Sequence, residues 1–298
     1  MEIQWTYQGL TPISVKEFVK IQGLPRKFMA AVKHQGGRIL VNSQDVTVRA
    51  ILRPGDQLVI VPPIEAGHDS VPPSDIPIDI VFEDRDLLVV NKPIQTVSIP
   101  SLKNPDSSMA NRIKGYYVNQ AYDDQVIHIV TRLDRDTTGL MLVAKHRLAH
   151  AFLDKQLQAG ALKKYYMAIS QGTQWETRGQ IQAPIARNPE SIISRRVHSS
   201  GQAAVTLYER LETYPDGCLL RLHLLTGRTH QIRVHLAHLG GPLVGDTLYQ
   251  GRVSSPIYRQ ALHCSELNFV HPFSHQRIHL KTDLPPDMAT WLDQRRSV

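Results

Sequence analysis

Hydrophobic residues occur along the chain in short runs of β-strand length, separated by longer stretches with helical spacing. The first part contains two short helical patterns, "SVKEFVKIQ" and "PRKFMAAVKH", followed by strands at "RILVN" and "QLVIV". After residue 76 the expected strands are "DIVFE", "LLVVN", "LMLVA", "KYYMAI", "AAVTLYE", "CLLRLHLL" and "QRIHLKT", and the expected helices cover residues 107–119, 147–158 and 229–239. This order predicts an α+β fold in which helices flank a mixed, largely antiparallel sheet.

The segment "VPPIEAGHDSVPPSDIP" (61–77) interrupts these patterns, with five prolines and no apolar periodicity. Proline removes a backbone donor and biases the preceding residue toward extended geometry, so the segment predicts a semi-rigid linker with few contacts across it. We therefore expect three parts: a small α/β module at residues 1–62, a linker at 63–75 and a large domain at 76–298.

The chain of 298 residues carries a formal charge of +7. This basic balance favours a polyanionic partner, most simply a nucleic acid, although a positively charged surface alone would give the same number. Two cysteines, Cys218 and Cys264, exclude a disulfide scaffold and a CxxC zinc site. The chain shows no secretory pattern at its start and no run of roughly 18 apolar residues, so we expect a cytoplasmic protein.

The stretch "TRLDRDTTGLMLVAKH" (131–146) places two aspartates and two arginines just before an apolar strand, as in a structural ion network or a reaction site. "DRDTT" also fits the D-x-D-x-T pattern of phosphatases, but their metal needs further carboxylates at a spacing that does not follow here. The histidine pairs of "HRLAH" and "HPFSH" lack the residues that usually complete a metal site. We therefore expect no metal.

The segment "RLDRDTTGLMLVAK" resembles the catalytic stretch of RluA-type pseudouridine synthases, H-R-L-D-x-x-T-[ST]-G followed by an apolar strand. Further blocks resemble the same family in its order: "VFEDRDLLVVNKP", "KKYYMAISQG", "LLTGRTHQIRVHLAHLGGPLVGDTLYQG" and "LHCSELNFVHP". The resemblance implies that residues 76–298 are the catalytic domain of an RNA pseudouridine synthase, an isomerase that moves the ribosyl C1′ from N1 to C5 of uracil in ribosomal or transfer RNA. It implies RNA as the partner and no cofactor, because the reaction involves no redox change. The alternative is a protein of this fold that binds RNA or assists ribosome assembly without catalysis.

The same resemblance gives roles to four residues: Asp134 as the nucleophile, Tyr166 as the active-site tyrosine, Arg228 as the ion-pair partner of the aspartate, and Arg132 as the side chain that enters the RNA stack when the base leaves. A guanidinium favours the ionised form of a buried carboxylate, and a tyrosine can stack on a flipped uracil and help to move its proton. Two places depart from the family pattern. Thr131 replaces a histidine, and "KPIQTVSIPS" (92–101) lacks the usual glycine and histidine.

The small module resembles S4-type RNA-binding modules in its helix pair, in "GRILVN" (37–42) and in its terminal "GDQLVI". This resemblance implies that basic side chains of the module contact RNA, namely Arg26, Lys27, Lys33 and Arg38. Solvated basic residues on an ordinary small domain would give the same pattern.

Overall fold

The computed structural model describes residues 2–65, 67 and 71–296, and its N-terminal unit packs two helices against a four-stranded antiparallel sheet of order β1-β6-β3-β4. The elements of this unit are β1 (Ile3–Thr6), β2 (Ile13–Ser14), α1 (Val15–Ile21), α2 (Arg26–His34), β3 (Arg38–Val41), β4 (Gln44–Asp45), β5 (Ile51–Leu52) and β6 (Gln57–Val61). Ser14 and Glu17 form a capping box that fixes the start of α1. Buried side chains from both helices and the sheet give the unit a hydrophobic core of its own.

The larger unit is built on a ten-stranded sheet in the order β12-β15-β16-β11-β17-β10-β8-β7, with β18 beside β17 and β9 beside β10. β10 and β17 pair in parallel, and the other described pairings of this sheet are antiparallel, which confirms a mixed, mostly antiparallel sheet. The strands are β7 (Ile80–Glu83), β8 (Leu87–Lys92), β9 (His128–Ile129), β10 (Thr138–Ala144), β11 (Lys163–Gln171), β12 (Arg178–Gln182), β15 (Val205–Tyr214), β16 (Gly217–Leu224), β17 (Leu262–Val270) and β18 (Arg277–Lys281).

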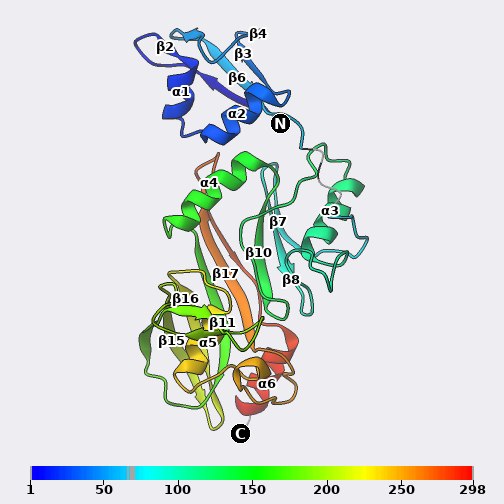
Figure 1. Ribbon diagram of the computed structural model, residues 1–298, viewed down its shortest axis with the longest axis vertical. Helices are drawn as coiled ribbons and strands as arrows, with labels where there is room; N and C mark the ends of the chain where they lie inside the picture. The colour runs from blue at the N-terminus through cyan, green and yellow to red at the C-terminus, as the bar shows by residue number, and fades with distance from the viewer. Residues whose placement is uncertain (1, 66, 68–70, 297–298) are drawn as a thin grey trace.

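Helices lie around this sheet, as Figure 1 shows. α3 (Met109–Asn119) and α4 (Arg147–Gln158) match the predicted helices closely, and α5 (Gln231–His238) is slightly shorter than predicted. The predictions did not include the central strand β17 or these further elements: β12, β13 (Ile185–Arg187), β14 (Arg195–Val197), the short 3-10 helix η1 (Thr247–Tyr249) and α6 (Pro286–Arg296).

The centre of the core is β10, all seven residues of which are buried between β8 and β17. At the second residue of β10, Gly139 has φ 108°, and a Cβ placed there would lie 2.2 Å from the carbonyl oxygen of Cys264. Only glycine allows this close approach of the two parallel strands. The loop before β10, which contains Asp134, is thereby held against the middle of the sheet.

After Val61, the last residue of β6, the proline-rich segment forms no helix or strand in its described residues, but it is fixed to the larger unit. The Glu65 carboxylate accepts hydrogen bonds from the backbone N–H and Nε of Arg147 and lies 2.8 Å from Nε2 of His128. Burial opposes its ionisation, but the bonds from His128 and Arg147 outweigh burial and lower the pKa of Glu65 to about 2. Farther along, the Ser74 N–H donates to the carbonyl of Asn111 in α3.

The two units also contact each other directly through α4, which lies next to the N-terminal unit in Figure 1. Leu148 belongs to the N-terminal hydrophobic core, and Phe152 packs against it. The Lys155 ammonium donates to the carbonyl of Gly23 at 2.9 Å, and Arg147 donates to the Gln35 side chain at 3.3 Å. Besides the linker, the two units therefore share a small direct contact through α4.

Candidate active site

The loop that contains Asp134 is held at several points along its backbone. Oγ1 of Thr131 accepts the backbone N–H of Leu142 at 2.9 Å, so the residue that replaces the family histidine supports the loop. The Ser98 hydroxyl bonds both the N–H and the carbonyl of Leu133. Gln95 occupies the position of the family glycine and has φ 54°, a left-handed conformation that glycine adopts more easily. The unusual segment 92–101 thus keeps the turn without its glycine and braces the loop through Ser98.

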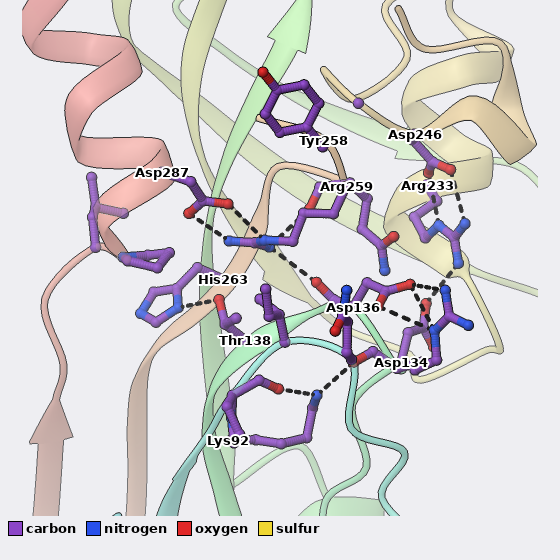
Figure 2. Close-up of a pocket in the computed structure, with 18 of the residues that line it drawn as sticks. Lys92, Asp134, Asp136, Thr138, Arg233, Asp246, Tyr258, Arg259, His263 and Asp287 are labelled. Carbon is purple, nitrogen blue, oxygen red and sulfur yellow. Dashed lines mark hydrogen bonds and ion pairs between the residues drawn. The ribbon is translucent and has the colours of Figure 1, made fainter. Parts of the chain in front are cut away.

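Two buried basic side chains hold carbonyl groups just after Asp134 (Figure 2). Nζ of Lys92 donates to the carbonyl of Arg135 at 2.9 Å, and to two carbonyls of its own segment. Nη1 of Arg259 donates to the carbonyl of Asp136 at 3.0 Å, while its Nε and Nη2 bond the Asp287 carboxylate of α6. Burial lowers the pKa of Lys92 to about 7, although nearby Asp136 and Asp134 oppose this shift. The loop conformation therefore depends on partners from β8 and from the C-terminal part of the chain.

The ion-pair partner of Asp134 is Arg233, in the first turn of α5. Its Nη1 lies 3.2 Å from Asp134 Oδ2, and its Nε and Nη2 make a bidentate pair with the buried Asp246 at 2.7 and 2.8 Å. Nε2 of His230 lies 3.7 Å from the same Asp134 oxygen. Burial opposes the charge on Arg233, but the contacts with Asp246 and Asp134 raise its pKa above the ordinary arginine value. Asp246 thus fixes the guanidinium that faces Asp134.

The ion pair predicted for Arg228 is not found among the described residues. Arg228 lies before α5 and is exposed, and its Nε donates to the carbonyl of Ala203 at 3.1 Å. The physical reason is the position of the helix: α5 begins at Gln231, so its first turn directs Arg233 toward the Asp134 loop, whereas Arg228 belongs to the preceding turn of chain. Arg228 still lines the small cavity described next.

Asp134 and Tyr166 line the same small cavity, together with Arg132, Arg228 and Ile232. Tyr166 lies on β11 at a register shift against β17, and its side chain is buried. Burial, reinforced by Cys264 and Asp134, raises the pKa of Tyr166 well above the ordinary tyrosine value. Its phenol is therefore protonated at neutral pH. The exposed Arg132 also lines this cavity, next to Asp134 in the chain.

Comparison with known proteins shows the family of the chain. A family described as "RNA pseudouridylate synthase" matches residues 86–238. The Bacillus subtilis protein named "Uncharacterized RNA pseudouridine synthase YjbO" is 41% identical over 277 residues, which cover 93% of this chain and 97% of that protein. The chain belongs to the RNA pseudouridylate synthase family.

Other relatives agree with this assignment. The "Ribosomal large subunit pseudouridine synthase D" of Escherichia coli K12 is 38% identical over 275 residues, covering 87% of this chain and 83% of that protein. The solved structure titled "Human RNA Pseudouridylate Synthase Domain Containing 4" has the same fold, with a TM-score of 0.61 and 22% identity over 73% of this chain and 93% of that one. The protein is accordingly an isomerase that converts uridine to pseudouridine in RNA.

The basic residues predicted in the N-terminal unit of this pseudouridine synthase differ in their surroundings. Arg26, Lys27 and Lys33 are exposed on α2. Arg38 is exposed too, but its guanidinium makes a bidentate contact with Asp45 at 3.0 and 2.8 Å. A phosphate would have to compete with this carboxylate for Arg38.

Of the described helices, none is both long and apolar enough to cross a membrane.

A cluster of Asp84, Asp86 and His271 in the synthase has the spacing of a cation site, with ligand atoms within 4.8 Å of one another. However, Nδ1 of His271 accepts backbone N–H groups two and three residues farther on, which leaves the proton on Nε2, 2.9 Å from Asp84. His146 caps α4 in the same way through Nδ1, and its Nε2 lies 3.0 Å from Asp86. Each of these imidazoles is then neutral, and the hydrogen on its Nε2 leaves no free lone pair there for a metal. The first histidine of each motif therefore lies against the turn between β7 and β8, His146 from the start of α4 and His271 from the end of β17.

The sequence patterns did not single out several residues of this site. Arg233 falls outside the apolar stripe of its helix, and that was the available signal for a polar role. Asp246, Lys92 and Arg259 lie far from Asp134 in the chain, and no local spacing connects them to it.

Proposed function

We propose that Asp134 is the nucleophile of the isomerisation and that the small cavity beside Tyr166 receives the flipped uracil. The observation that supports this most strongly is the Arg233 guanidinium, 3.2 Å from the Asp134 carboxylate at the wall of that cavity. Attack by the carboxylate on the sugar or on the uracil ring divides one difficult exchange into two steps. The N1–C1′ bond breaks and the C5–C1′ bond forms. C5 loses a proton and N1 gains one, so the reaction balances without an oxidant or a co-reactant.

In this proposal Arg233 keeps Asp134 ionised when RNA covers it. A base over the cavity removes water and would favour the neutral acid, whereas the adjacent guanidinium favours the anion. Asp246 keeps the guanidinium in place, because its bidentate bonds use Nε and Nη2 and leave Nη1 for Asp134. Arg233 therefore takes the role that the sequence assigned to Arg228.

Tyr166 provides the face on which the uracil rests. Its raised pKa makes it a poor base at neutral pH, so we assign it stacking and a neutral hydroxyl rather than proton abstraction as a phenolate. Arg132 lies exposed on the same cavity and is placed to fill the gap left in the RNA. Base flipping costs a few kcal/mol, and filling the vacated stack would offset part of that cost.

We further propose that the substrate is structured RNA, in the first place ribosomal RNA, as the name of the Escherichia coli relative suggests. The N-terminal unit is proposed to be an S4-like RNA-binding module. Its helix pair carries the exposed side chains of Arg26, Lys27 and Lys33, which suit phosphate contacts. Arg38 is a weaker candidate because Asp45 already neutralises it.

Substitution of the nucleophile tests the proposal. Asp134→Asn should abolish pseudouridine formation while RNA affinity stays within a few-fold of wild type, because the amide has the same shape but cannot act as an anionic nucleophile. Wild type and variant would be incubated with total cellular RNA, followed by carbodiimide-based mapping of pseudouridine.

The outcomes separate the alternatives. Turnover by Asp134→Asn would disprove the assigned nucleophile. Absence of product with the wild type, on RNA from a strain lacking the protein, would support an RNA-binding protein without catalysis.

A further inference from the structure

A second cavity, of about 1210 Å³, meets the uracil cavity at Asp134, His230 and Arg233. Its walls come from the segments 91–95, 245–248 and 256–260 and from the start of α6, but not from Tyr166. Space of this size continues the site beyond the one nucleotide that reacts. The chemistry of its lining indicates which part of the RNA it accepts.

The arginines and the lysine of the lining already have partners. Arg259 is paired with Asp287, Arg233 with Asp246 and Asp134, and Arg135 with Asp136, while Lys92 donates to backbone carbonyls. A phosphate would have to break these contacts, and the carboxylates would repel it. The cavity therefore suits an uncharged part of RNA, which is a nucleobase.

The rim of the cavity is apolar and exposed. Ile94, Ile193, Leu248 and Tyr258 all line it, and Tyr258 is 71% exposed. The Trp, Tyr and Phe residues of the chain all fall in the described ranges, and of these only Tyr258 is exposed. An exposed aromatic side chain at the edge of an RNA site is a typical stacking surface for an unpaired base.

Tyr258 is held in place by its neighbours, so its exposure does not come from a loose loop. Ile257 is fully buried in a hydrophobic cluster with Trp291 of α6. Arg259 is buried and tied to Asp287 and to the carbonyl of Asp136. Figure 2 shows the Tyr258 ring beside Arg259, on the side away from Lys92, without a bond to the other residues drawn.

We infer that this cavity binds the nucleobase adjacent to the target uridine, with Tyr258 as its stacking face. The inference rests on the proposed function, because it takes the cavity of Tyr166 as the uracil site. When the uridine leaves the stack, its neighbour loses a stacking partner, and Tyr258 replaces it. The target uridine then lies in a loop or bulge, where the neighbouring base is free to leave a helix.

The test combines a protein variant with a modified RNA. The probe is a short hairpin containing a uridine that the wild type converts, with an abasic nucleotide placed in turn at each of the two positions on either side. Tyr258→Ala, Tyr258→Phe and a control, Leu211→Ala, an exposed position outside the cavity, are compared for affinity and for single-turnover rate at saturating RNA.

Tyr258→Ala should weaken binding roughly 5- to 100-fold, as expected for the loss of one stacked base, with a smaller change in the saturated rate. Tyr258→Phe should behave as wild type. At one of these positions, the abasic nucleotide should weaken RNA binding by the wild type by a similar factor. It should weaken RNA binding by Tyr258→Ala only slightly further. Equal affinity of Tyr258→Ala and Leu211→Ala, or full additivity of the two losses at every position, would overturn the inference. Failure of the proposed function would differ, since the unmodified hairpin would then give product with Asp134→Asn.

Discussion

The charged residues around Asp134 and those of the N-terminal unit are arranged in opposite ways. The residues that hold Asp134 are buried and paired: Asp246 is 2% exposed and fixes Arg233, which in turn faces Asp134. In the N-terminal unit Arg26, Lys27 and Lys33 extend from α2 into solvent. Loss of one partner from a buried ion pair has a large effect, because it leaves an uncompensated buried charge. Exposed charges each contribute little, and their contributions add. Catalysis should therefore depend on single residues and RNA affinity on the sum of many.

Outside the Asp134 site, the largest effect should come from removal of the N-terminal unit. A chain beginning at Pro62 keeps Glu65 bound to Arg147 and retains Asp134, Tyr166 and Arg233. We expect apparent KM for long structured RNA to rise by roughly tenfold or more, with the single-turnover rate at saturation within a few-fold of wild type.

Truncation also uncovers Leu148 and Phe152 of α4, which pack into the N-terminal core. The shortened chain should therefore be studied together with a version carrying Leu148→Gln, which reduces the apolar surface exposed. A truncated, folded chain with unchanged affinity and unchanged salt dependence would show that the N-terminal unit does not bind RNA.

A medium effect is expected from Lys92, through the pH dependence of stability. Burial lowers its pKa to about 7 from the ordinary 10.5. Between these values the unfolded chain holds a proton that the folded chain has released, so this group makes the fold more stable as pH rises from about 7 to about 10.5. Lys92→Met should remove that rise, which is at most about 1.4 kcal/mol per pH unit.

Urea unfolding at pH 7, 8 and 9 would measure the difference between wild type and Lys92→Met. The exposed Lys103 offers a matched control, as Lys103→Met should keep the wild-type slope. Parallel stability curves for wild type and Lys92→Met would contradict the lowered pKa.

The smallest effect should distinguish two basic residues within the N-terminal unit. Lys33→Ala should reduce the slope of log affinity against log salt by roughly 0.7–0.9, the value for one lost phosphate contact. Arg38→Ala should change it less, because Asp45 already pairs with that guanidinium at 2.8 Å. Filter binding at several salt concentrations gives both slopes, and a larger change for Arg38→Ala would reverse the assignment.

The sequence predicted those parts of the fold whose signal is local. The strand "LMLVA" and the helix at 147–158 were found because their apolar spacing reports burial directly. β17 was missed as a strand, although it pairs in parallel with β10 at the centre of the sheet, because its polar residues Ser265 and Glu266 interrupt the apolar run. The contacts of Glu65 could not be predicted either, since its partners His128 and Arg147 lie 63 and 82 residues away.

The site shows the same limit. The segment around Asp134 and the tyrosine of β11 were located from motifs, and the structure places Asp134 and Tyr166 on one cavity. The ion pair with Asp134 was predicted for Arg228, at the start of "GRTHQIR", whereas the structure forms it with Arg233, at the end of that motif. The motif does not say where α5 begins. Helix phase alone separates Arg233, which is itself buried, from the apolar face formed by Ile232 and Leu236. Its partner is determined by how α5 docks beside the Asp134 loop, which no local pattern contains.

The central claim is that Arg233, and not Arg228, holds Asp134, the proposed nucleophile. The direct measurement is the single-turnover rate at saturating RNA for Arg233→Met and Arg228→Met. Arg233→Met should lose roughly 10²–10³-fold or more in rate and about 3–5 kcal/mol in stability, because Asp246 and Asp134 both lose their cation. Arg228→Met should stay within a few-fold of wild type in both. A fast Arg233→Met together with an inactive, folded Arg228→Met would contradict the account.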